Sequence, residues 1–413
     1  MSVRNIVGNV PEPDELYGRD DLIAHLWRQL AGNNMLILGP RRFGKSGIMR
    51  HLLQRPKEGF IPVSMDLMDA DSPAEFVLRL TEAVLEQDRL RAVLHKARGI
   101  PTVLKRLIAD TFEAVEYEGI KLELRKSIEG NWRDTARRLV LELEKADDTI
   151  LFLLDEFPVM MATMGVKHGQ GTAQDFMAWF SSFRLQSKDV LRRHRFVIAG
   201  SIGIDSILRR IDPPDKLRDF ERLPVGGIAE EDALRLVNDL AASLDLDIPA
   251  DLGTASLDLI GPRVPFFIHL LFSQLAQLQP KERHPITRLA LDRVYLDKVL
   301  GPTCKSRFDH YRDRLQRYGR PLERAAMAVL RMIADAPSGR VPVSGLFDSY
   351  RKSRGRGANQ TEFDELLADL ECDWYVCLAP QTNEYYFMVS VMRDWWRRWY
   401  GSARRGAVAK GGR

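Results

Sequence analysis

Short, dense runs of apolar residues punctuate this chain, and between them apolar positions recur mostly at helical spacing. Four runs stand out: Met35–Leu38, Phe60–Leu67, Thr149–Leu154 and Arg195–Ala199. Runs of this density are typical of strands buried on both faces, as the strands of a parallel sheet are. The pattern therefore predicts an α/β protein in which helices cover both faces of a parallel sheet.

Helical periodicity dominates the segments between and after these strands. A helical insertion is predicted near residues 70–147, with a small hairpin around Glu118. A loop rich in Gly and Met is expected after residue 157, before a helix over Ala173–Gln186. Residues 203–228 are predicted to form a polar connector, and the pattern over 226–301 is that of a helical lid.

A separate C-terminal domain is predicted from about residue 302. Its expected elements are helices over Leu322–Ala334, Val343–Arg351 and Gln360–Cys372, then strands over Trp374–Pro380 and Glu384–Val389. Helix, helix, helix, hairpin is the order of a winged helix. A last helix over Val391–Tyr400 carries three tryptophans at a spacing more typical of a core than of a platform for stacking bases.

The patterns together predict four parts. The sheet-containing core spans residues 1–225 and the helical lid spans 226–301. The winged-helix-like domain spans 302–401, and the tail over 402–413, rich in Gly, Ala, Arg and Lys, is expected to be disordered.

The first apolar run leads into a phosphate-binding motif. The residues Gly39-Pro40-Arg41-Arg42-Phe43-Gly44-Lys45-Ser46 fit G-x-x-x-x-G-K-[ST] in full, and a helical segment begins at Gly47. Strand, glycine loop and helix together turn backbone N–H groups and the positive end of a helix toward a phosphate. Lys45 is expected to reach the β- and γ-phosphates, and Ser46 to ligate Mg²⁺.

Carboxylates close the third run, at the carboxyl end of a strand, where open α/β sheets bind ligands. Asp155 is expected to hold the Mg²⁺ shell, and Glu156 to orient and deprotonate an attacking water. The fourth run ends at Ser201, which is either a sensor of the γ-phosphate or a simple strand-end turn. Asp66 closes the second run and either reaches the metal's water shell or, more commonly for such a position, begins a helix.

These motifs resemble the AAA+-related P-loop ATPases of the STAND group, in the branch called archaeal-type ATPases. The likeness spans roughly residues 12–300. The resemblance rests on the following segments: the box Tyr17-Gly18-Arg19-Asp20, the phosphate loop, Leu154–Pro158, Ala199–Ser201, Leu223–Val225 leading into Glu230–Ala233, and Gly261–Pro265.

The resemblance implies a site for ATP or ADP with Mg²⁺. It further implies that Tyr17, Gly18, Arg19 and Pro265 contact the base, because the matching box and proline do so in that family. The spacing from Gly261 to Pro265 is one residue longer than the family's Gly-x-Pro. Adenine is inferred from the resemblance alone.

Arginines near these motifs have two possible roles each. The pair Arg41-Arg42 is a family trait, and either residue braces the phosphates or pairs with an acidic neighbour. The connector carries four more: Arg209, Arg210, Arg218 and Arg222. One of them could be an arginine finger that reaches a neighbouring subunit's γ-phosphate, although a salt-bridged surface is the commoner role for such residues.

Composition fits an intracellular protein of several domains. The chain has 413 residues, of which 45% are hydrophobic, and no apolar run approaches the roughly 20 residues that span a bilayer. No apolar segment of the signal-peptide kind follows Met1, and three cysteines are too few for a disulfide framework. The expected location is the cytoplasm, without a membrane partner.

Charge argues both for and against nucleic-acid binding. Residues 302–413 contain 20 Lys and Arg against 13 Asp and Glu, so the basic excess of the chain is C-terminal. The helix expected over Gln360–Cys372 would enter a major groove, yet it holds five carboxylates and no Lys or Arg. Sequence-specific recognition by that helix is therefore not expected, since nucleic-acid affinity depends on cations.

The sequence leads to one main hypothesis and two alternatives. The main one is an ATP-binding and ATP-hydrolysing switch of the AAA+/STAND type, acting on a protein partner or on its own assembly. The first alternative is a DNA-binding ATPase that assists replication, transposition or defence against mobile elements. A small-molecule kinase is the weakest, because no acceptor pocket is evident from the sequence.

Overall fold

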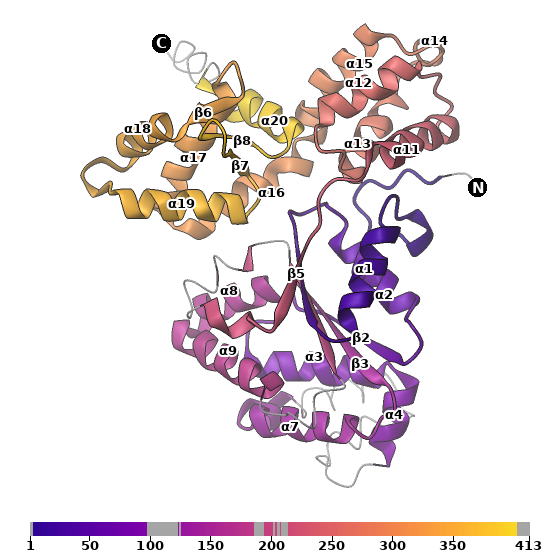
Figure 1. The fold of residues 1–413 in the computed structure, drawn as a ribbon, viewed down its shortest axis with the longest axis vertical. Coiled ribbons are helices and arrows are strands. Elements are labelled where there is room, and N and C mark those ends of the chain that lie inside the picture. The colour runs from indigo at the N-terminus through magenta and orange to yellow at the C-terminus, as the bar shows by residue number, and fades with distance from the viewer. Residues whose placement is uncertain are drawn as a thin grey trace.

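A five-stranded parallel sheet forms the centre of the N-terminal half of the molecule (Figure 1). The computed structural model describes residues 3–96, 123, 125–185, 194–200, 203–204, 207 and 214–402. The strands lie in the order β2-β3-β4-β1-β5, and each pairs in parallel with its neighbours. Their bounds are β1 Asn34–Leu38, β2 Phe60–Asp66, β3 Thr149–Asp155, β4 Arg195–Ala199 and β5 Phe220–Pro224.

Helices cover both faces of this sheet, as the apolar pattern predicts. One face packs against α1 (Asp20–Leu30) and α2 (Lys45–Gln54). The other packs against α3 (Pro73–Leu85), α4 (Asp88–His95), α7 (Trp132–Leu143), α8 (Phe157–His168) and α9 (Gln170–Leu185). Successive side chains of a strand point to opposite faces, so Leu151 and Leu153 join one core while Phe152 and Leu154 join the other. The predicted α/β fold is confirmed.

Two predicted segments differ from the structure. The loop expected after residue 157 is the helix α8, which buries apolar side chains on most of its sides, so no amphipathic stripe signals it. The connector expected over 203–228 contains the edge strand β5, whose Glu221 and Arg222 are exposed. An edge strand tolerates such polar residues because only one of its sides is paired.

A helical group follows β5 and lies beside α1 and α2 at the upper right of Figure 1. It consists of α11 (Glu230–Ser243), α12 (Ala250–Ile260), α13 (Pro265–Leu275), α14 (Pro280–Arg283) and α15 (Arg288–Val294), the last continued by a π-helical turn over Tyr295–Val299. This agrees with the helical pattern predicted for the lid.

The C-terminal elements form a second α/β group at the upper left of Figure 1. In chain order they are α16 (Ser306–Arg314), α17 (Arg320–Asp335), β6 (Arg340–Pro342), α18 (Val343–Arg354), α19 (Gln360–Cys372), β7 (Val376–Ala379), β8 (Glu384–Phe387) and α20 (Ser390–Tyr400). The strands form an antiparallel sheet in the order β6-β8-β7. Sequence analysis missed α16 and β6, while its bounds for α19 match the structure.

Several predictions lie outside the described residues: the hairpin around Glu118, Ser201, the finger candidates Arg209 and Arg210, and the tail after residue 402. In the part of the chain that the structure describes, no helix is both long and apolar enough to cross a membrane.

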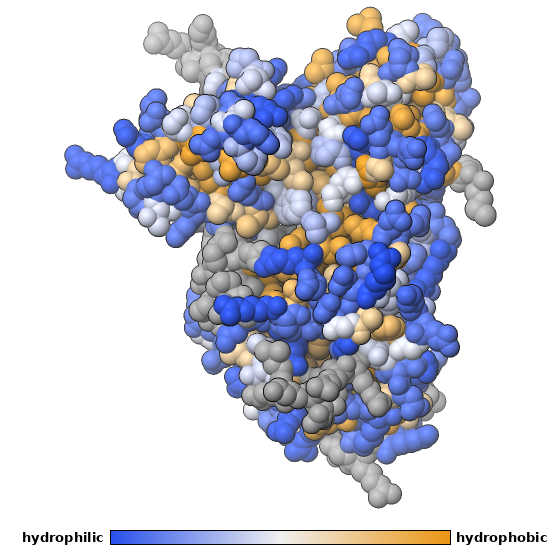
Figure 2. Space-filling view, viewed as in Figure 1, coloured by the Kyte–Doolittle hydropathy of each residue, from blue (hydrophilic) through white to orange (hydrophobic). Residues whose placement is uncertain are grey.

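One apolar core runs through all three groups. It begins on the sheet face under α1 and α2, continues through α11–α15 and ends among the side chains of α17–α20. Trp395 and Trp396 are fully buried in it, in agreement with the core role predicted for them. Figure 2 shows a mostly hydrophilic face on which apolar side chains emerge near the middle, where the groups meet.

Candidate functional site

The predicted phosphate loop leaves the carboxyl end of β1 and wraps the N-terminus of α2. Its backbone has positive φ at Gly39 (156°), Arg42 (73°) and Gly44 (91°). A β-carbon at Gly39 would lie 2.8 Å from the carbonyl oxygen of Val225, so only glycine fits at the start of the loop. The motif thus forms a compact turn whose amides lead into a helix N-terminus, the geometry that binds phosphate.

Lys45 is buried beneath this loop. Its Nζ donates to the carbonyl oxygens of Gly39 and Pro40, both at 2.7 Å. Burial lowers the pKa of Lys45 to about 7, and the nearby positive charge of Arg314 contributes further. The amine is therefore held at the centre of the loop. An anionic ligand there would offset the cost of burying its positive charge.

Ser46 and Asp155 meet at the end of the sheet. The Ser46 hydroxyl donates to Asp155 Oδ2 at 2.8 Å, and the backbone N–H of Glu156 donates to Asp155 Oδ1 at 3.0 Å. Burial raises the pKa of Asp155, although the Ser46 hydrogen bond opposes this. The sequence places these residues 109 positions apart, and the parallel sheet brings them together.

Glu156 occupies the turn between β3 and α8 and has a left-handed backbone, with φ of 56°. Non-glycine residues adopt this conformation rarely, and it is enriched at functional sites. Asp66 pairs with Asp155 in the sheet register, so the second acidic strand end lies next to the first.

These residues line a cavity of about 360 Å³ that three parts of the chain enclose. The phosphate loop and the acidic strand ends form one side, and the N-terminal segment from Ile6 to Tyr17 forms another. Pro265, Phe266 and His269 of α13 complete it. At Gly47 a β-carbon would lie 2.9 Å from Leu16 Cδ2, so this glycine lets the N-terminal segment pack on α2.

The residues of the Tyr17 box have different positions in the site. Tyr17 lines the cavity, and its hydroxyl donates to Asp239 Oδ2 at 2.8 Å. Arg19 also lines it, but its guanidinium donates to the carbonyl oxygens of Phe43 and Gly226 at 3.3 and 2.7 Å. Burial lowers the pKa of Arg19 to about 10. Its contacts are those of a brace between the loop and the segment that leads to α11.

The two loop arginines contact different parts of the chain, Arg42 through its side chain and Arg41 through its backbone. Arg42 Nη1 donates to the carbonyl oxygen of Gly8 at 3.2 Å, and its guanidinium lies 4.9 Å from the ring centre of Phe266. The backbone carbonyl of Arg41 accepts a hydrogen bond from the Tyr311 hydroxyl of α16 at 2.9 Å. Within the described part of the chain, neither arginine forms an ion pair with a carboxylate.

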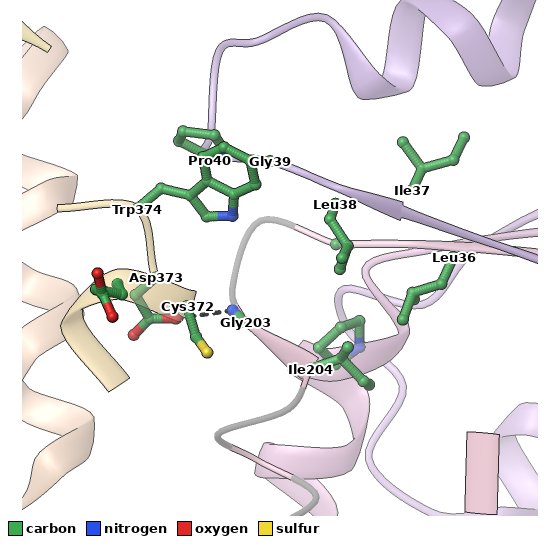
Figure 3. Close-up of a pocket in the computed structure, with 13 residues that line it drawn as sticks. Leu36, Ile37, Leu38, Gly39, Pro40, Gly203, Ile204, Cys372, Asp373 and Trp374 are labelled. Carbon is green, nitrogen blue, oxygen red and sulfur yellow. Dashed lines mark hydrogen bonds between the residues drawn. The ribbon is translucent and has the colours of Figure 1, made fainter. Parts of the chain in front are cut away.

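The C-terminal group also reaches this end of the sheet, which the sequence does not indicate. Asp373 and Trp374, at the end of α19, line a cavity of about 260 Å³ with Gly39 and Pro40 (Figure 3). The N–H of Gly203 donates to Asp373 Oδ1 at 2.8 Å. Arg218 and Arg222, the described finger candidates, lie instead beside and in β5, with exposed side chains.

A magnesium ion fits the oxygen pair at the sheet edge. Mg²⁺ is held by one or two protein oxygens together with phosphate oxygens and waters. The hydroxyl of Ser46 and the carboxylate of Asp155 supply such a pair. Among the described residues, no three His, Cys, Asp or Glu side chains gather into a cluster that could hold a metal ion.

Comparisons with known proteins support the fold. No protein-family model matches the chain, and no curated protein does either. The Walker-type ATPase PABY2304 of Pyrococcus abyssi superposes with a TM-score of 0.66 at 16% identity, over 95% of this chain and 99% of that one. The ORC2 protein of Aeropyrum pernix, solved as ADPNP–ADP complexes, gives 0.50 at 14% identity, over 94% and 96%.

This chain has the P-loop NTPase fold, with helices on both faces of a parallel sheet and a phosphate loop after β1. The likeness extends over nearly the whole length of both chains, so the helical and C-terminal groups belong to the shared architecture.

Proposed function

We propose that this protein binds and hydrolyses ATP and uses the nucleotide state as a switch on a macromolecular partner. One observation carries the proposal: the Ser46 hydroxyl and the Asp155 carboxylate lie 2.8 Å apart beside the buried amine of Lys45. That is the set of groups that phosphoryl transfer needs around the β- and γ-phosphates.

Each group has a defined task in this proposal. Lys45 and the loop amides Gly39–Gly47 bind the phosphates and stabilise charge that develops on them. Ser46 and Asp155 would hold Mg²⁺, and the ion would supply positive charge to offset the negative charge of the phosphates. Glu156 positions a water and accepts its proton. Ser201, which lies outside the described residues, is proposed as the sensor of the γ-phosphate.

The base is proposed to lie between the N-terminal segment and α13. Tyr17, Pro265 and Phe266 give this part of the cavity apolar surface, as nucleotide sites commonly have. Adenine nucleotides are favoured by the resemblance to STAND ATPases, and the Aeropyrum pernix protein was solved with ADPNP and ADP. Gly18 is a backbone support in this arrangement rather than a lining residue.

The switch has a proposed moving part. We assign residues 1–225 to the ATPase core with its insertion, 226–301 to the lid and 302–401 to a winged-helix-like domain. The last follows from its order of elements, since β6 precedes α18, and α19 leads into the β7–β8 hairpin. The C-terminal group contacts the phosphate loop directly, so a change at the phosphates has a physical route to it.

The Glu156→Gln variant tests the catalytic part. The amide keeps the shape and the turn but cannot accept a proton, so hydrolysis is expected to fall at least 100-fold while ATP binding persists. Phosphate release with Mg²⁺ and a titration with a fluorescent ATP analogue measure the two separately. Glu231→Gln, at an exposed position of α11, is the matched control. Equal turnover in the Glu156→Gln variant would remove Glu156 from the role of base.

The nucleotide state of the purified protein tests the switch. The chain is denatured and any released nucleotide identified, and turnover is then measured with ATP and Mg²⁺. Bound ADP with slow turnover supports a switch that waits for a partner. An empty site with fast turnover contradicts it and favours a working motor.

A DNA-binding ATPase is the second candidate, and an exposed basic turn favours it. Arg351, Lys352 and Arg356 lie at the end of α18 with exposed side chains. Arg354 there is paired with Glu362 of α19, at 2.7 Å. Contact with a nucleic-acid backbone is therefore proposed for the turn, and not base recognition by the acidic α19.

A gel-shift titration at low and moderate salt tests this candidate. Binding through three cations should weaken steeply as salt rises. The triple substitution Arg351→Ala, Lys352→Ala and Arg356→Ala should abolish it. The absence of binding even at low salt would reject the candidate.

A further inference from the structure

The helix α16, which sequence analysis missed, crosses the phosphate loop and joins the two helical groups. Phe308 stacks between Phe267 of α13 and Trp395 of α20, with ring centres 5.6 and 5.5 Å apart. Three residues later the Tyr311 hydroxyl donates to the backbone of Arg41. The helix is thus fixed at once to the lid, to the C-terminal group and to the loop.

Arg314 is the last residue of α16, and it has no described partner for one end of its guanidinium. Its Nη2 atom is shielded from solvent and makes no hydrogen bond to any described residue. Such a buried donor costs free energy unless something accepts from it. The nearby carboxylate Asp373 already accepts from the Tyr318 hydroxyl at 2.6 Å and from the N–H of Gly203.

The unpartnered guanidinium borders a cavity of about 510 Å³ at the edge of the nucleotide site. The other lining residues include Arg41 of the phosphate loop, and Val159 and Thr163 of α8, the helix that follows Asp155 and Glu156. Arg41 lines both this cavity and the nucleotide cavity, so the two adjoin at the loop.

Positive charge outweighs negative charge around this cavity, since Arg41, Lys167, Arg314 and Arg317 line it together with the carboxylate of Asp313. Burial and the charges of Arg314, Arg41 and Arg42 lower the pKa of His310 to about 2, so its imidazole is neutral at pH 7. The charge of Arg314 also lowers the pKa of Lys45. Like charges this close repel one another in surroundings of low dielectric, and a multivalent anion between them would offset the repulsion.

We propose that Arg314 binds the terminal phosphate of the nucleoside triphosphate and so reports its presence to the C-terminal group. This inference rests on the proposed nucleotide site. Lys45 and the loop hold the phosphate chain on one side, and Arg314 supplies a donor from a different group of elements. Loss of the terminal phosphate removes that bond, and the repulsion among the remaining cations then weakens the attachment of α16 to the loop.

The role differs from that of a trans-acting finger, because Arg314 belongs to the same chain as Lys45. The Tyr311–Arg41 hydrogen bond places α16 on the loop, and Arg314 lines the adjoining cavity together with Arg41. Arg317, one turn further on, approaches Asp373 at 3.5 Å and so holds the following turn to the end of α19.

Nucleotide titrations of the full-length chain test the proposal. The dissociation constants of fluorescent ADPNP and ADP are measured with Mg²⁺ for the wild type, Arg314→Gln and Arg314→Lys. Removal of one charged hydrogen bond should weaken ADPNP binding roughly 10- to 100-fold and change ADP binding less than about threefold. Arg314→Lys should recover part of the loss. Arg312→Gln, on the same helix but paired with Glu323, is the control.

Thermal unfolding provides the readout that a merely structural arginine would not give. Arg314→Gln removes a partly buried charge whose Nη2 atom has no hydrogen-bond partner among the described residues, so the nucleotide-free variant should unfold at a higher temperature than the wild type. The extra stabilisation that ADPNP gives over ADP should shrink in the same variant. A structural role would instead lower the unfolding temperature of every state.

The outcomes separate the two proposals. If the wild type binds neither nucleotide, the proposed function is overturned and the role of Arg314 with it. If the wild type binds both, and Arg314→Gln binds ADPNP and ADP as the wild type does, the role of Arg314 alone is overturned. An equal loss for ADPNP and ADP overturns it too, because ADP lacks the phosphate that Arg314 is proposed to bind.

Discussion

At the scale of single residues, the site contains two kinds of group. Sequence motifs identify some of them, and only the fold reveals the others. Lys45, Ser46, Asp155 and Glu156 follow from a loop pattern and from carboxylates at a strand end, and the parallel sheet places them together. Arg314 could not be predicted in this way. Its neighbours come from the loop and from α8, and no local pattern encodes a contact across such a separation.

His269 carries a prediction at this scale. Its Nδ1 accepts from the backbone N–H of Ile6 at 3.3 Å, and burial lowers its pKa to about 4. A folded-state pKa below the unfolded value means that the unfolded chain binds more protons between about pH 4 and 6.5. The stability from neutral His269 is therefore complete above about pH 6.5 and is lost as the pH falls toward 4.

The expected loss over that window is roughly 3 kcal/mol, from the difference between the two pKa values. His269→Asn retains an acceptor but cannot titrate, so its stability should fall less between pH 6.5 and 4.5 in denaturant unfolding. His25→Asn, at an exposed site, should follow the wild type. Parallel curves for His269→Asn and the wild type would contradict the assignment.

At the scale of elements, a helix or strand could be predicted from the sequence when its buried residues leave a clear apolar pattern. Strands β1, β3 and β4 and the helix α19 could be predicted, because dense apolar runs or a clear amphipathic pattern mark them. The edge strand β5 and the largely buried α8 could not, since the first is too polar and the second too apolar for its own periodicity. Helix α16 was missed for a related reason. Its stretch is mostly charged, and only Phe308 and Tyr311 are buried.

Phe308 supplies the prediction for this scale. Its fully buried ring lies between Phe267 and Trp395, so Phe308→Ala leaves a cavity at the junction of three groups. The free energy of unfolding should fall by about 3–5 kcal/mol in urea or guanidinium titrations. Leu289→Ala, at an exposed position of α15, should change it by less than about 0.5 kcal/mol. A loss as small as the control's would mean that α16 is not held by this stack.

At the scale of the whole molecule, the C-terminal group covers part of the end of the sheet where the nucleotide is proposed to bind. The end of α19 lies against the phosphate loop, with Trp374 beside Pro40 (Figure 3). In this arrangement Asp373 is buried, so a partner that binds through its carboxylate must do so after the group has moved.

Asp373 tests this attachment. Asp373→Ala leaves the Tyr318 hydroxyl and the Gly203 N–H without their acceptor, which costs about 1–3 kcal/mol each when they stay buried. Amide hydrogen exchange around Trp374 should accelerate, while α1 and α2 keep their protection. Asp348→Ala, exposed on α18, should leave exchange unchanged. Unaltered exchange in Asp373→Ala would show that other contacts hold α19 in place.

The continuous apolar core constrains how such a switch can move. A domain that is attached only by a flexible linker can rotate about it with almost no energy barrier. Here, by contrast, one apolar core packs the sheet, α13 and the C-terminal helices together. Close-packed interfaces shift by sliding between alternative packings rather than by opening wide. Motion of the C-terminal group would therefore be a small shear with a high activation barrier. Under the proposed function, such a barrier would make each nucleotide state long-lived, so we expect slow exchange between the two states.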